Sequence, residues 1–561
     1  MSPPSLVPSI AAGPLDTAFA GACARLDEQA FADALWRADD TVWSDDPATR
    51  RLVAGRLGWL RAMEAVTPHL VRLRTLAGDV ARDGITDVVL LGMGGSSLAP
   101  EVMRRVIGPA PGAPRFFVLD SVDPDAVRAA MARAGTSLFV LASKSGSTIE
   151  PNAMAAEARR RLVSAGLADW GSRFIAITDE ATSLHRRAVD EGFREAFVNP
   201  SDIGGRYSAL SLFGMVPAAL MGLDVDGLLA SARAMDAACR APHAADNPAL
   251  ALGALMAAGA ETGRDKLTLL LPSRLAPFGL WVEQLVAEST GKHGKGVVPV
   301  VGIPHDRVDR SDVVLVAVSL GGDSLQGGTA AAADVPRADI AMPDTHALGA
   351  EFLRWEIATA AAGWLLEINP FDEPNVQQAK DATRALLDTY ARQRMLPAPA
   401  PDATVNDVRW SLSEPAKTAL TGSPATSFLD VVRPHDYVAL LAYLPPEDET
   451  WHGPLEALRA ELAGRTGCAT TLGYGPRYLH STGQLHKGGA NNGVFVIVTA
   501  EATSDLDVPD EPFTFGVLET AQAIGDFQSL ERTDRRALLL TLPMRDPALL
   551  RQVMRDLGTR R

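Results

Sequence analysis

Two loops rich in glycine, serine and threonine carry groups suited to binding an anion. In LGMGGSSLAPEV, Gly95 lets a ligand approach the backbone, and Ser96 offers a hydroxyl at the start of a predicted helix. A denser group lies in ASKSGSTIEPN, where four hydroxyls and one cation fall within six residues: Ser143, Lys144, Ser145, Ser147 and Thr148. Thr148 is expected to cap the helix that follows. Together the loops predict a monophosphate site, although each alone is compatible with a tight turn or a capping loop.

A carboxylate and a guanidinium elsewhere could perform acid–base chemistry. In QLVAESTGK, a helix from about Phe278 to Gly291 would place four side chains on one face: Trp281, Gln284, Leu285 and Glu288. Desolvation on this mostly apolar face disfavours a charged carboxyl group, which suits Glu288 to a general base. In GGRYS, Arg206 follows Gly205 and could stabilise negative charge developing on a substrate oxygen. A solvated glutamate and a structural ion pair are the alternatives.

These residues require a scaffold in which strands alternate with helices. Residues 15–80 are predicted to be helical, and four short apolar runs then alternate with helical stretches: 86–92, 115–120, 137–143 and 173–179. Such alternation predicts βαβ units and a parallel sheet, whose ligands lie beyond the carboxyl ends of the strands. Both anion-binding loops follow such strands, so they should lie at the same edge of one sheet.

The alternation resumes twice more along the chain. Strands are predicted at 265–272 and 311–319, with helices at 346–368 and from there to about Gln393. Further strands are predicted at 436–444 and 493–501. We therefore expect an α/β protein with an N-terminal helical segment, two parallel-sheet domains, a Pro/Ala-rich linker and a C-terminal α/β unit: 1–80, 81–240, 241–395, 396–404 and 405–561.

Five segments in this order resemble the sugar isomerase (SIS) domains of phosphoglucose isomerases: GMGGSSLAPE, ASKSGSTIEPN, DIGGRYSALS, QLVAESTGK and NPFDEPNVQQAK. The resemblance covers roughly residues 80–395. It implies two SIS-type domains, a hexose 6-phosphate substrate and a reaction without a metal or redox cofactor.

The resemblance also assigns roles to residues of this sequence. It implies that Glu288 moves a proton between C2 and C1 through an enediol, and that Lys380 opens the sugar ring with a histidine. It places Gly95, Ser96, Gly205 and the serine- and threonine-rich loop around the substrate. At Glu373 this sequence departs from the glutamine usual in the family. A second acid there would repel a phosphate unless it is paired or points away. A solvated lysine is the alternative for Lys380.

The expected histidine lies in an unusual place. Family members carry it between the glutamate and lysine motifs, but here the similar segment, YLHSTGQLHKGG, follows the lysine and supplies His480. This order resembles the isomerase part of bifunctional transaldolase/phosphoglucose isomerases. In the usual family homodimer the neighbouring subunit provides the histidine, so His480 could act within its own chain or across a dimer. His346 is the second candidate, and a surface histidine in a glycine-rich loop is the alternative.

The composition fits this interpretation. The 561 residues carry a net charge of -15, which disfavours binding to nucleic acid or an anionic membrane. The three cysteines are far apart, which predicts a reducing cytoplasm without disulfides or a zinc site. Two other functions stay open: an isomerase that also accepts mannose 6-phosphate, and a non-catalytic sugar-phosphate sensor. The complete acid–base set argues against the sensor.

Overall fold

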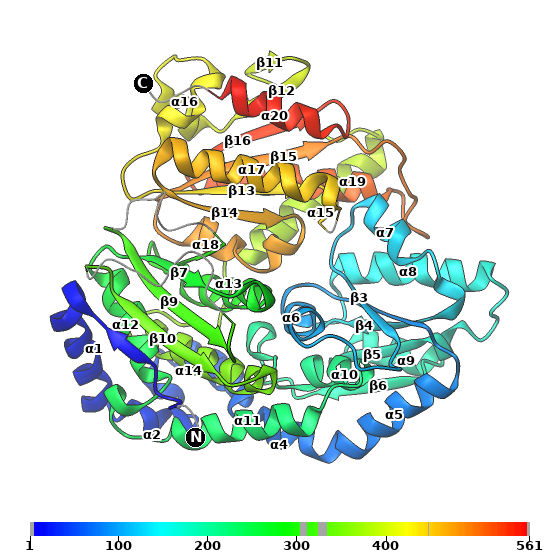
Figure 1. Ribbon diagram of the computed structural model, residues 1–561. Coiled ribbons are helices and arrows are strands. Elements are labelled where there is room, and N and C mark those ends of the chain that lie inside the picture. The colour runs from blue at the N-terminus through cyan, green and yellow to red at the C-terminus, as the bar shows by residue number, and fades with distance from the viewer. Residues whose placement is uncertain (1–4, 303–310, 324–333, 447, 558–561) are drawn as a thin grey trace.

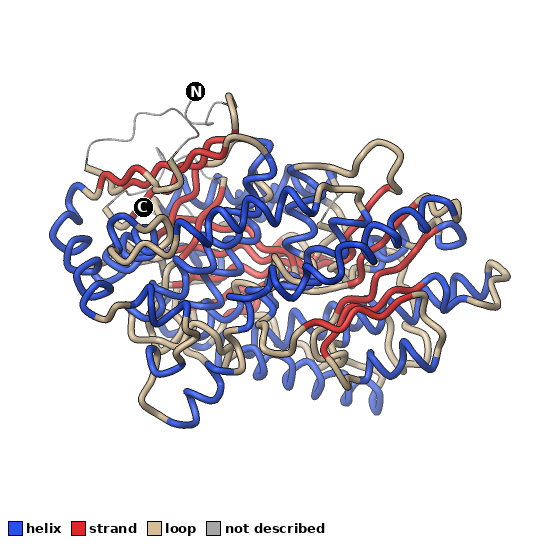
Figure 2. The backbone as a smooth tube through the Cα atoms, turned by 90° about the horizontal axis from the view of Figure 1, so that it is seen from below, coloured by secondary structure: helices blue, strands red, loops and turns tan. Residues whose placement is uncertain are grey.

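The computed structural model describes residues 5–302, 311–323, 334–446 and 448–557. Three sheets with flanking helices make up this part of the chain (Figure 1). In the view from below, helices lie on both sides of the strands at the right of the molecule (Figure 2). The predicted α/β class is confirmed, as is each strand predicted from a continuous apolar run.

The first sheet is entirely parallel, with strand order β3-β2-β4-β5-β6. Its strands are β2 (Asp87–Leu91), β3 (Arg115–Leu119), β4 (Ser137–Ala142), β5 (Phe174–Asp179) and β6 (Glu195–Asn199). Its helices are α6 (Leu98–Val106), α7 (Pro124–Ala130), α8 (Ile149–Ser164) and α9 (Ser183–Asp190). Every residue of β2 and β4 is buried, because both faces of these central strands are covered.

The second sheet has the order β1-β10-β9-β7-β8 and is parallel except at β1. Its strands are β1 (Ser9–Ala11), β7 (Lys266–Leu270), β8 (Val298–Val301), β9 (Val313–Leu320) and β10 (Arg337–Met342). The helices of this part of the molecule are α10 (Leu212–Leu220), α11 (Val225–Ala238), α12 (Leu250–Glu261), α13 (Phe278–Thr290), α14 (Leu348–Leu365) and α15 (Val376–Gln393).

The N-terminal segment is helical over the range predicted, 15–80, and a short strand precedes the helices. It forms α1 (Asp16–Glu28), α2 (Phe31–Trp36), α3 (Pro47–Ala54), α4 (Ala62–Val66) and α5 (Leu70–Arg82), as expected. Before them, however, β1 pairs antiparallel with β10. An uncovered β10 would present unpaired backbone groups at the sheet edge, and β1 satisfies them. A strand of three residues is too short to be recognised from periodicity.

The C-terminal unit is a six-stranded sheet of order β11-β12-β16-β15-β13-β14. Its strands are β11 (Ala403–Val405), β12 (Val408–Leu412), β13 (Tyr437–Tyr443), β14 (Ala469–Tyr474), β15 (Gly493–Ala500) and β16 (Arg536–Leu542). Its helices are α16 (Glu414–Leu420), α17 (Glu449–Thr466), α18 (Gly483–Gly488), α19 (Phe515–Arg532) and α20 (Pro547–Asp556). The stretch 394–402, between α15 and β11, forms neither helix nor strand.

Among the described residues, no helix has both the length and the apolar character needed to cross a membrane.

The C-terminal unit packs against both preceding sheets. One apolar cluster joins the first sheet to α15 and α19, with Phe139, Leu387 and Leu518 among its members. Another joins β8 to the third sheet through Val300 and Ile497. The three units therefore converge on three short 3-10 turns: η5 (Gly94–Ser96), η8 (Gly205–Tyr207) and η13 (Arg477–His480).

The contact between η5 and η8 depends on a glycine. A Cβ atom on Gly95 would lie 2.0 Å from the carbonyl oxygen of Gly205, which is backbone and cannot rotate away. A Cβ atom on Gly205 would meet nothing within 4 Å, and Gly205 does not have a positive φ. The two glycines face each other, but only Gly95 needs to lack a side chain.

We expect Gly95→Ala to destabilise the protein by about 1–3 kcal/mol, the usual cost of overpacking. It should also reduce turnover, because η8 carries Arg206. Scanning calorimetry and steady-state assays of Gly95→Ala should show both losses, whereas Gly205→Ala should keep the melting temperature of the wild type. Equal behaviour of the two variants would contradict this role of the contact.

Candidate active site

Glu288 lies in the last turn of α13, where the helical pattern predicts it. Its side chain is 10% exposed, and α13 ends at Gly291 as expected. A Cβ atom on Gly291 would lie 2.3 Å from the Cα atom of Leu485, so this glycine lets α18 approach. Burial raises the pKa of Glu288, and the nearby Glu373 carboxylate raises it further against the opposing effect of Arg206. A carboxyl group with a raised pKa is suited to accept a proton near neutral pH.

The guanidinium of Arg206 lies between two carboxylates. Its Nη1 is 3.4 Å from Glu288 Oε1 and 3.0 Å from Glu373 Oε2. Its Nε donates to Ser289 Oγ at 2.8 Å, and its Nη2 donates to the carbonyl oxygens of Pro370 and Asp372. All three nitrogens of the buried fork are thus engaged, which fixes its orientation beside Glu288. Glu373 is therefore paired, one of the two conditions under which a second acid could be tolerated here.

A single glutamine connects the glutamate to the histidine segment. Gln284 Nε2 lies one helical turn before Glu288 and donates to Glu288 Oε2 at 3.2 Å and to the backbone oxygen of His480 at 2.7 Å. The structure thus brings His480 to the glutamate within one chain. His346 lies elsewhere, in η11 (Thr345–Ala347), where its ring faces Asp224 and Asp344.

The side chain of His480 faces a buried acid. Its Nε2 lies 2.9 Å from Glu150 Oε1, which also accepts a hydrogen bond from Gln522 Nε2 at 2.7 Å. Burial raises the pKa of Glu150, but its interactions with His480 outweigh burial and leave the pKa below the ordinary value. An ionised carboxylate can only accept, so Nε2 carries the proton and Nδ1 is the atom that can exchange a proton with a substrate.

A cavity of about 300 Å³ lies beside this pair. Lys380 of α15 is exposed at its wall. The other lining residues come from α15, the first unit and the C-terminal unit: Thr383, Arg384, Leu387, Ser147, Thr148, Ile149, Glu150, Leu479, His480 and Gln522. The cavity therefore combines two cations, Lys380 and Arg384, with an imidazole and hydroxyls. Glu288 and Arg206 do not line it; Gln284 links them to it through the backbone of His480.

The serine- and threonine-rich loop is held by its own hydrogen bonds. Ser143 Oγ donates to Thr148 Oγ1 at 3.2 Å, and the hydroxyls of Ser145 and Ser147 are 3.0 Å apart. Thr148 stands at the N-cap position of α8, but its side chain makes no capping hydrogen bond, contrary to the prediction. Its hydroxyl accepts the hydrogen bond from Ser143 instead.

Lys144 is less available than its sequence suggests. Its Nζ is 2.5 Å from Asp179 Oδ2 and 2.7 Å from the carbonyl oxygen of Ser201. The charge of this lysine is thus largely compensated within the protein. In the first loop, Ser96 of η5 is half-buried next to Gly95, where η5 packs against η8 and η13.

Sequence reasoning did not assign several polar residues that the structure places at the site. Gln284 and Glu150 both lie inside quoted motifs, and the four-residue spacing from Gln284 to Glu288 was the available signal. Lys292 follows α13 and contacts Asp372 Oδ1 at 2.8 Å; burial lowers the pKa of this lysine to about 8. Gln522 had no signal, because it comes from a helix more than a hundred residues beyond α15.

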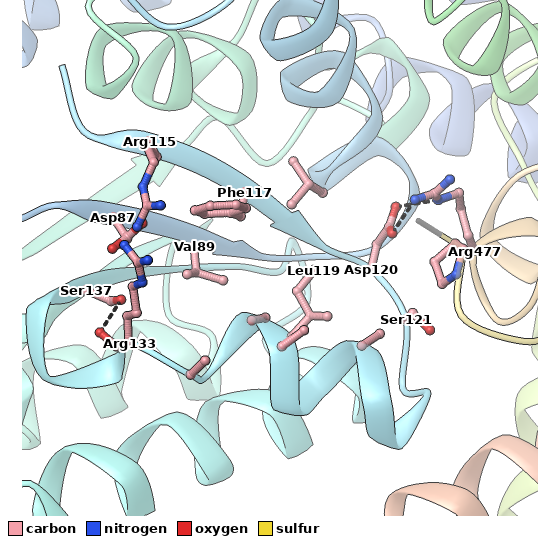
Figure 3. A pocket seen from close by; sticks show the side chains of 16 residues that line it. Asp87, Val89, Arg115, Phe117, Leu119, Asp120, Ser121, Arg133, Ser137 and Arg477 are labelled. Carbon is pink, nitrogen blue, oxygen red and sulfur yellow. Dashed lines mark hydrogen bonds and ion pairs between the residues drawn. The ribbon is translucent and has the colours of Figure 1, made fainter. Parts of the chain in front are cut away.

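An ion pair anchors the turn that carries His480. Arg477 donates from Nε and Nη2 to the two carboxylate oxygens of Asp120, each at 2.7 Å. Asp120 directly follows β3, and its side chain is 1% exposed. The pair lies at one end of a second pocket, between β3 and α7, with Arg115 and Arg133 at the other end (Figure 3). None of the predicted site residues lines this second pocket.

The fold and the site define an α/β protein built for proton transfer on a small anionic substrate. A family model for phosphoglucose isomerase matches residues 65–299. The glucose-6-phosphate isomerase of Parasynechococcus marenigrum (strain WH8102) is 32% identical over 381 residues, 60% of this chain and 69% of that protein. The glucose-6-phosphate isomerase of Synechococcus sp. (strain CC9605) is 31% identical over 378 residues, 59% of this chain and 71% of that protein.

Two solved structures share the fold of this chain. A hypothetical protein from Thermus thermophilus aligns with a TM-score of 0.56 and 26% identity, covering 68% of this chain and 99% of the other. A glucose-6-phosphate isomerase from Chlamydia trachomatis shares the fold with a TM-score of 0.51 at 21% identity, covering 60% of this chain and 75% of the other. The chain belongs to the phosphoglucose isomerase family.

The anchor of η13 gives a prediction for stability and activity together. Arg477→Ala leaves the buried Asp120 carboxylate without this partner, so we expect a loss of about 3–5 kcal/mol in stability. Turnover should fall at least tenfold, because η13 positions His480. Calorimetry and steady-state assays measure the two effects.

Arg82→Ala is the control, because Arg82 pairs with Asp79 at the surface with its own side chain 74% exposed. It should change stability by less than about 1 kcal/mol. If Arg477→Ala behaved like Arg82→Ala, the ion pair with Asp120 would not anchor the turn.

Proposed function

We propose that this protein interconverts glucose 6-phosphate and fructose 6-phosphate. The observation that carries the proposal is the hydrogen-bonded path from Glu288 through Gln284 to His480 and the cavity beside it. A buried base, a fixed guanidinium and a histidine–lysine cavity are the groups that an aldose–ketose isomerisation needs. The family membership points to the same reaction.

In the proposed proton transfer, Glu288 removes the proton from C2 of the open-chain aldose and returns it to C1. A proton moves from O2 to O1 in the same conversion, so the enediol collapses to the ketose with all atoms conserved. The Arg206 guanidinium lies 3.4 Å from Glu288, where it can stabilise negative charge on the enediol oxygens. Its other bonds hold it in place before substrate binds.

His480 and Lys380 are proposed to open the sugar ring. His480 passes a proton through Nδ1 to the ring oxygen as the C1–O5 bond breaks, and the hydroxyl on C1 gives up its proton to solvent water. Glu150 orients the imidazole through its contact with Nε2. Lys380 lies on the wall of the same cavity and can stabilise charge on the hydroxyl that becomes the aldehyde oxygen. We assign the phosphate to Ser143, Ser145, Thr148 and the neighbouring backbone, with Lys144 acting at a distance because Asp179 holds it.

The proposal needs no metal or redox group, because acid–base catalysis and charge stabilisation suffice. Within the described residues, no group of three or more His, Cys, Asp or Glu side chains could hold a metal ion. We further propose a cytoplasmic protein, since all three cysteines are free and buried. A homodimer remains part of the proposal, although the acid–base groups named above come from one chain.

Two other functions predict different results in the same assay. An isomerase with a wider pocket around C2 would also convert mannose 6-phosphate, so the two aldoses should be tested separately. A sugar-phosphate sensor would bind fructose 6-phosphate without turnover. The presence of a buried base beside a fixed guanidinium argues against the sensor.

Replacement of the proposed base tests the reaction. Wild-type protein assayed with EDTA should form glucose 6-phosphate from fructose 6-phosphate, and Glu288→Gln should lose at least about 10²-fold in kcat. Glu283→Gln is the matched control on the same helix, since Glu283 faces the pocket lined by Tyr474 and Arg477 rather than Arg206. Full activity of Glu288→Gln would mean that another group is the base, and an inactive folded wild type would favour the sensor.

Mixing two inactive variants tests whether His480 acts within its own chain. Each chain of an oligomer of His480→Ala and Glu288→Gln lacks one essential group, so we expect no recovery of activity after co-refolding. The shared bonds of Gln284 to both residues support this expectation. Recovery to a substantial fraction of wild-type activity would instead mean that the sites form across subunits.

A further inference from the structure

The site holds one more acid than the proton transfer requires. Glu373 follows α14 in the chain and has no assigned step in the reaction. It lies closer to the shared nitrogen of Arg206 than Glu288 does, at 3.0 Å against 3.4 Å, and only Glu373 receives a hydrogen bond from that nitrogen. Two carboxylates therefore compete for one guanidinium nitrogen. Glu373, which has no proposed role in proton transfer, is closer to it and accepts its hydrogen bond.

We propose that Glu373 is a positioning residue that keeps Arg206 from neutralising Glu288 and thereby sets the pH at which the catalytic base ionises. The inference rests on the proposed isomerase function. With Glu373 ionised, the guanidinium is already paired, and the net charge that Glu288 meets is close to zero. Without that competing charge, Arg206 would hold Glu288 in its ionised form as an ordinary buried ion pair.

The other groups around Glu288 do not replace this effect. On α13, Gln284 donates to Glu288 Oε2, and Ser289 is occupied by Arg206 Nε. Lys292, beyond the end of α13, adds positive charge, but it is paired with Asp372. The remaining neighbour on η8 is Tyr207, a neutral phenol with its pKa raised chiefly by burial. Around Glu373 itself, Arg56 adds a more distant positive charge.

The directions of the two pKa shifts agree with the geometry. The side chain of Glu373 is 37% exposed, so its burial is partial; this raises its pKa, yet Arg206 outweighs the effect and leaves the pKa below the ordinary value. Burial raises the pKa of Glu288, Arg206 opposes this, and Glu373 adds to the increase. The pair thus divides its roles: Glu373 carries the permanent charge, and Glu288 exchanges protons.

This division has a chemical purpose. A carboxylate held tightly by a guanidinium is a weak base, whereas one with a raised pKa removes a proton more readily once it is ionised. The arrangement keeps Arg206 fixed for charge stabilisation without weakening the base beside it. Opposed environments for neighbouring titratable groups are a recurrent way of separating an acid–base group from a permanently charged one.

The test is the pH dependence of turnover in Glu373→Gln. Glutamine keeps the shape and an oxygen acceptor for Arg206 but removes the charge. In wild type, kcat/KM should fall on the acid side as Glu288 becomes protonated. In Glu373→Gln this acid limb should move to lower pH by about one unit or more, the usual effect of a nearby charge. The plateau kcat should drop severalfold because the base is weaker. Glu373→Asp keeps the charge and should retain most of the wild-type limb.

Each alternative role for Glu373 gives a different pattern. A substrate contact would raise KM in Glu373→Gln and leave the acid limb in place. A purely structural role would lower the melting temperature of the variant without moving the limb. An unmoved limb, or one moved to higher pH, in a folded and active variant overturns the inference while leaving the isomerase function intact.

A second measurement does not depend on turnover, so it separates the two proposals. Because folding raises the pKa of Glu288, its contribution to stability is complete below the ordinary glutamate pKa and is lost as the pH rises through the folded-state pKa. Glu288→Gln removes this loss, so its melting temperature relative to wild type should rise over that pH range. In the Glu373→Gln background the rise should start at the same pH but end at lower pH and be smaller, because only the folded-state pKa of Glu288 falls. A rise of unchanged size would overturn the inference even if the wild type shows no isomerase activity.

Discussion

The buried Arg206 guanidinium is the constraint on which the site depends. A cation that is 4% exposed must find its charge and hydrogen-bond partners inside the protein. Those partners come from α13, from the backbone at Pro370 and Asp372, and from Glu373, while Arg206 itself belongs to η8. The first and second units are therefore joined through Arg206 at the point where the proposed base lies. The close contact of Gly95 with η8 follows from the same need for a fixed turn.

The C-terminal unit places His480 beside residues that lie far from it in the sequence. Two apolar clusters seat this unit against both preceding sheets, and the Asp120–Arg477 pair fixes the orientation of η13 locally. Apolar packing is non-directional, whereas a bidentate ion pair specifies an angle as well as a distance. The packing places η13 beside the cavity that Lys380 lines, and the ion pair holds His480 toward Glu150. The changed motif order is thus compatible with a site assembled from one chain.

Sequence reasoning identified the features that depend on local pattern. Buried strands such as β2 and β4 are continuous apolar runs, and α13 has a clear apolar face and a terminal glycine. It missed features that depend on tertiary contacts. The three residues of β1 acquire their conformation from the edge of β10, and the hydroxyl of Thr148 bonds with Ser143 and does not cap α8. The contact of Gln522 with Glu150 depends on how the C-terminal unit packs against the first sheet. No local sequence pattern predicts that packing.

The charges of the site explain how an acidic protein can accept an anionic sugar. The chain carries a net charge of -15, and the serine- and threonine-rich loop has its lysine paired with Asp179. Binding of a phosphate there would rest mainly on hydroxyls and on the N-terminal backbone of α8, which are neutral donors. Such donors are directional and need no counterion, so they favour a phosphate at one position without attracting polyanions in general. Positive charge is kept where charge develops during the proposed reaction, at Arg206 and Lys380, and Arg206 is paired with Glu373, which sets how much of its charge a substrate would meet.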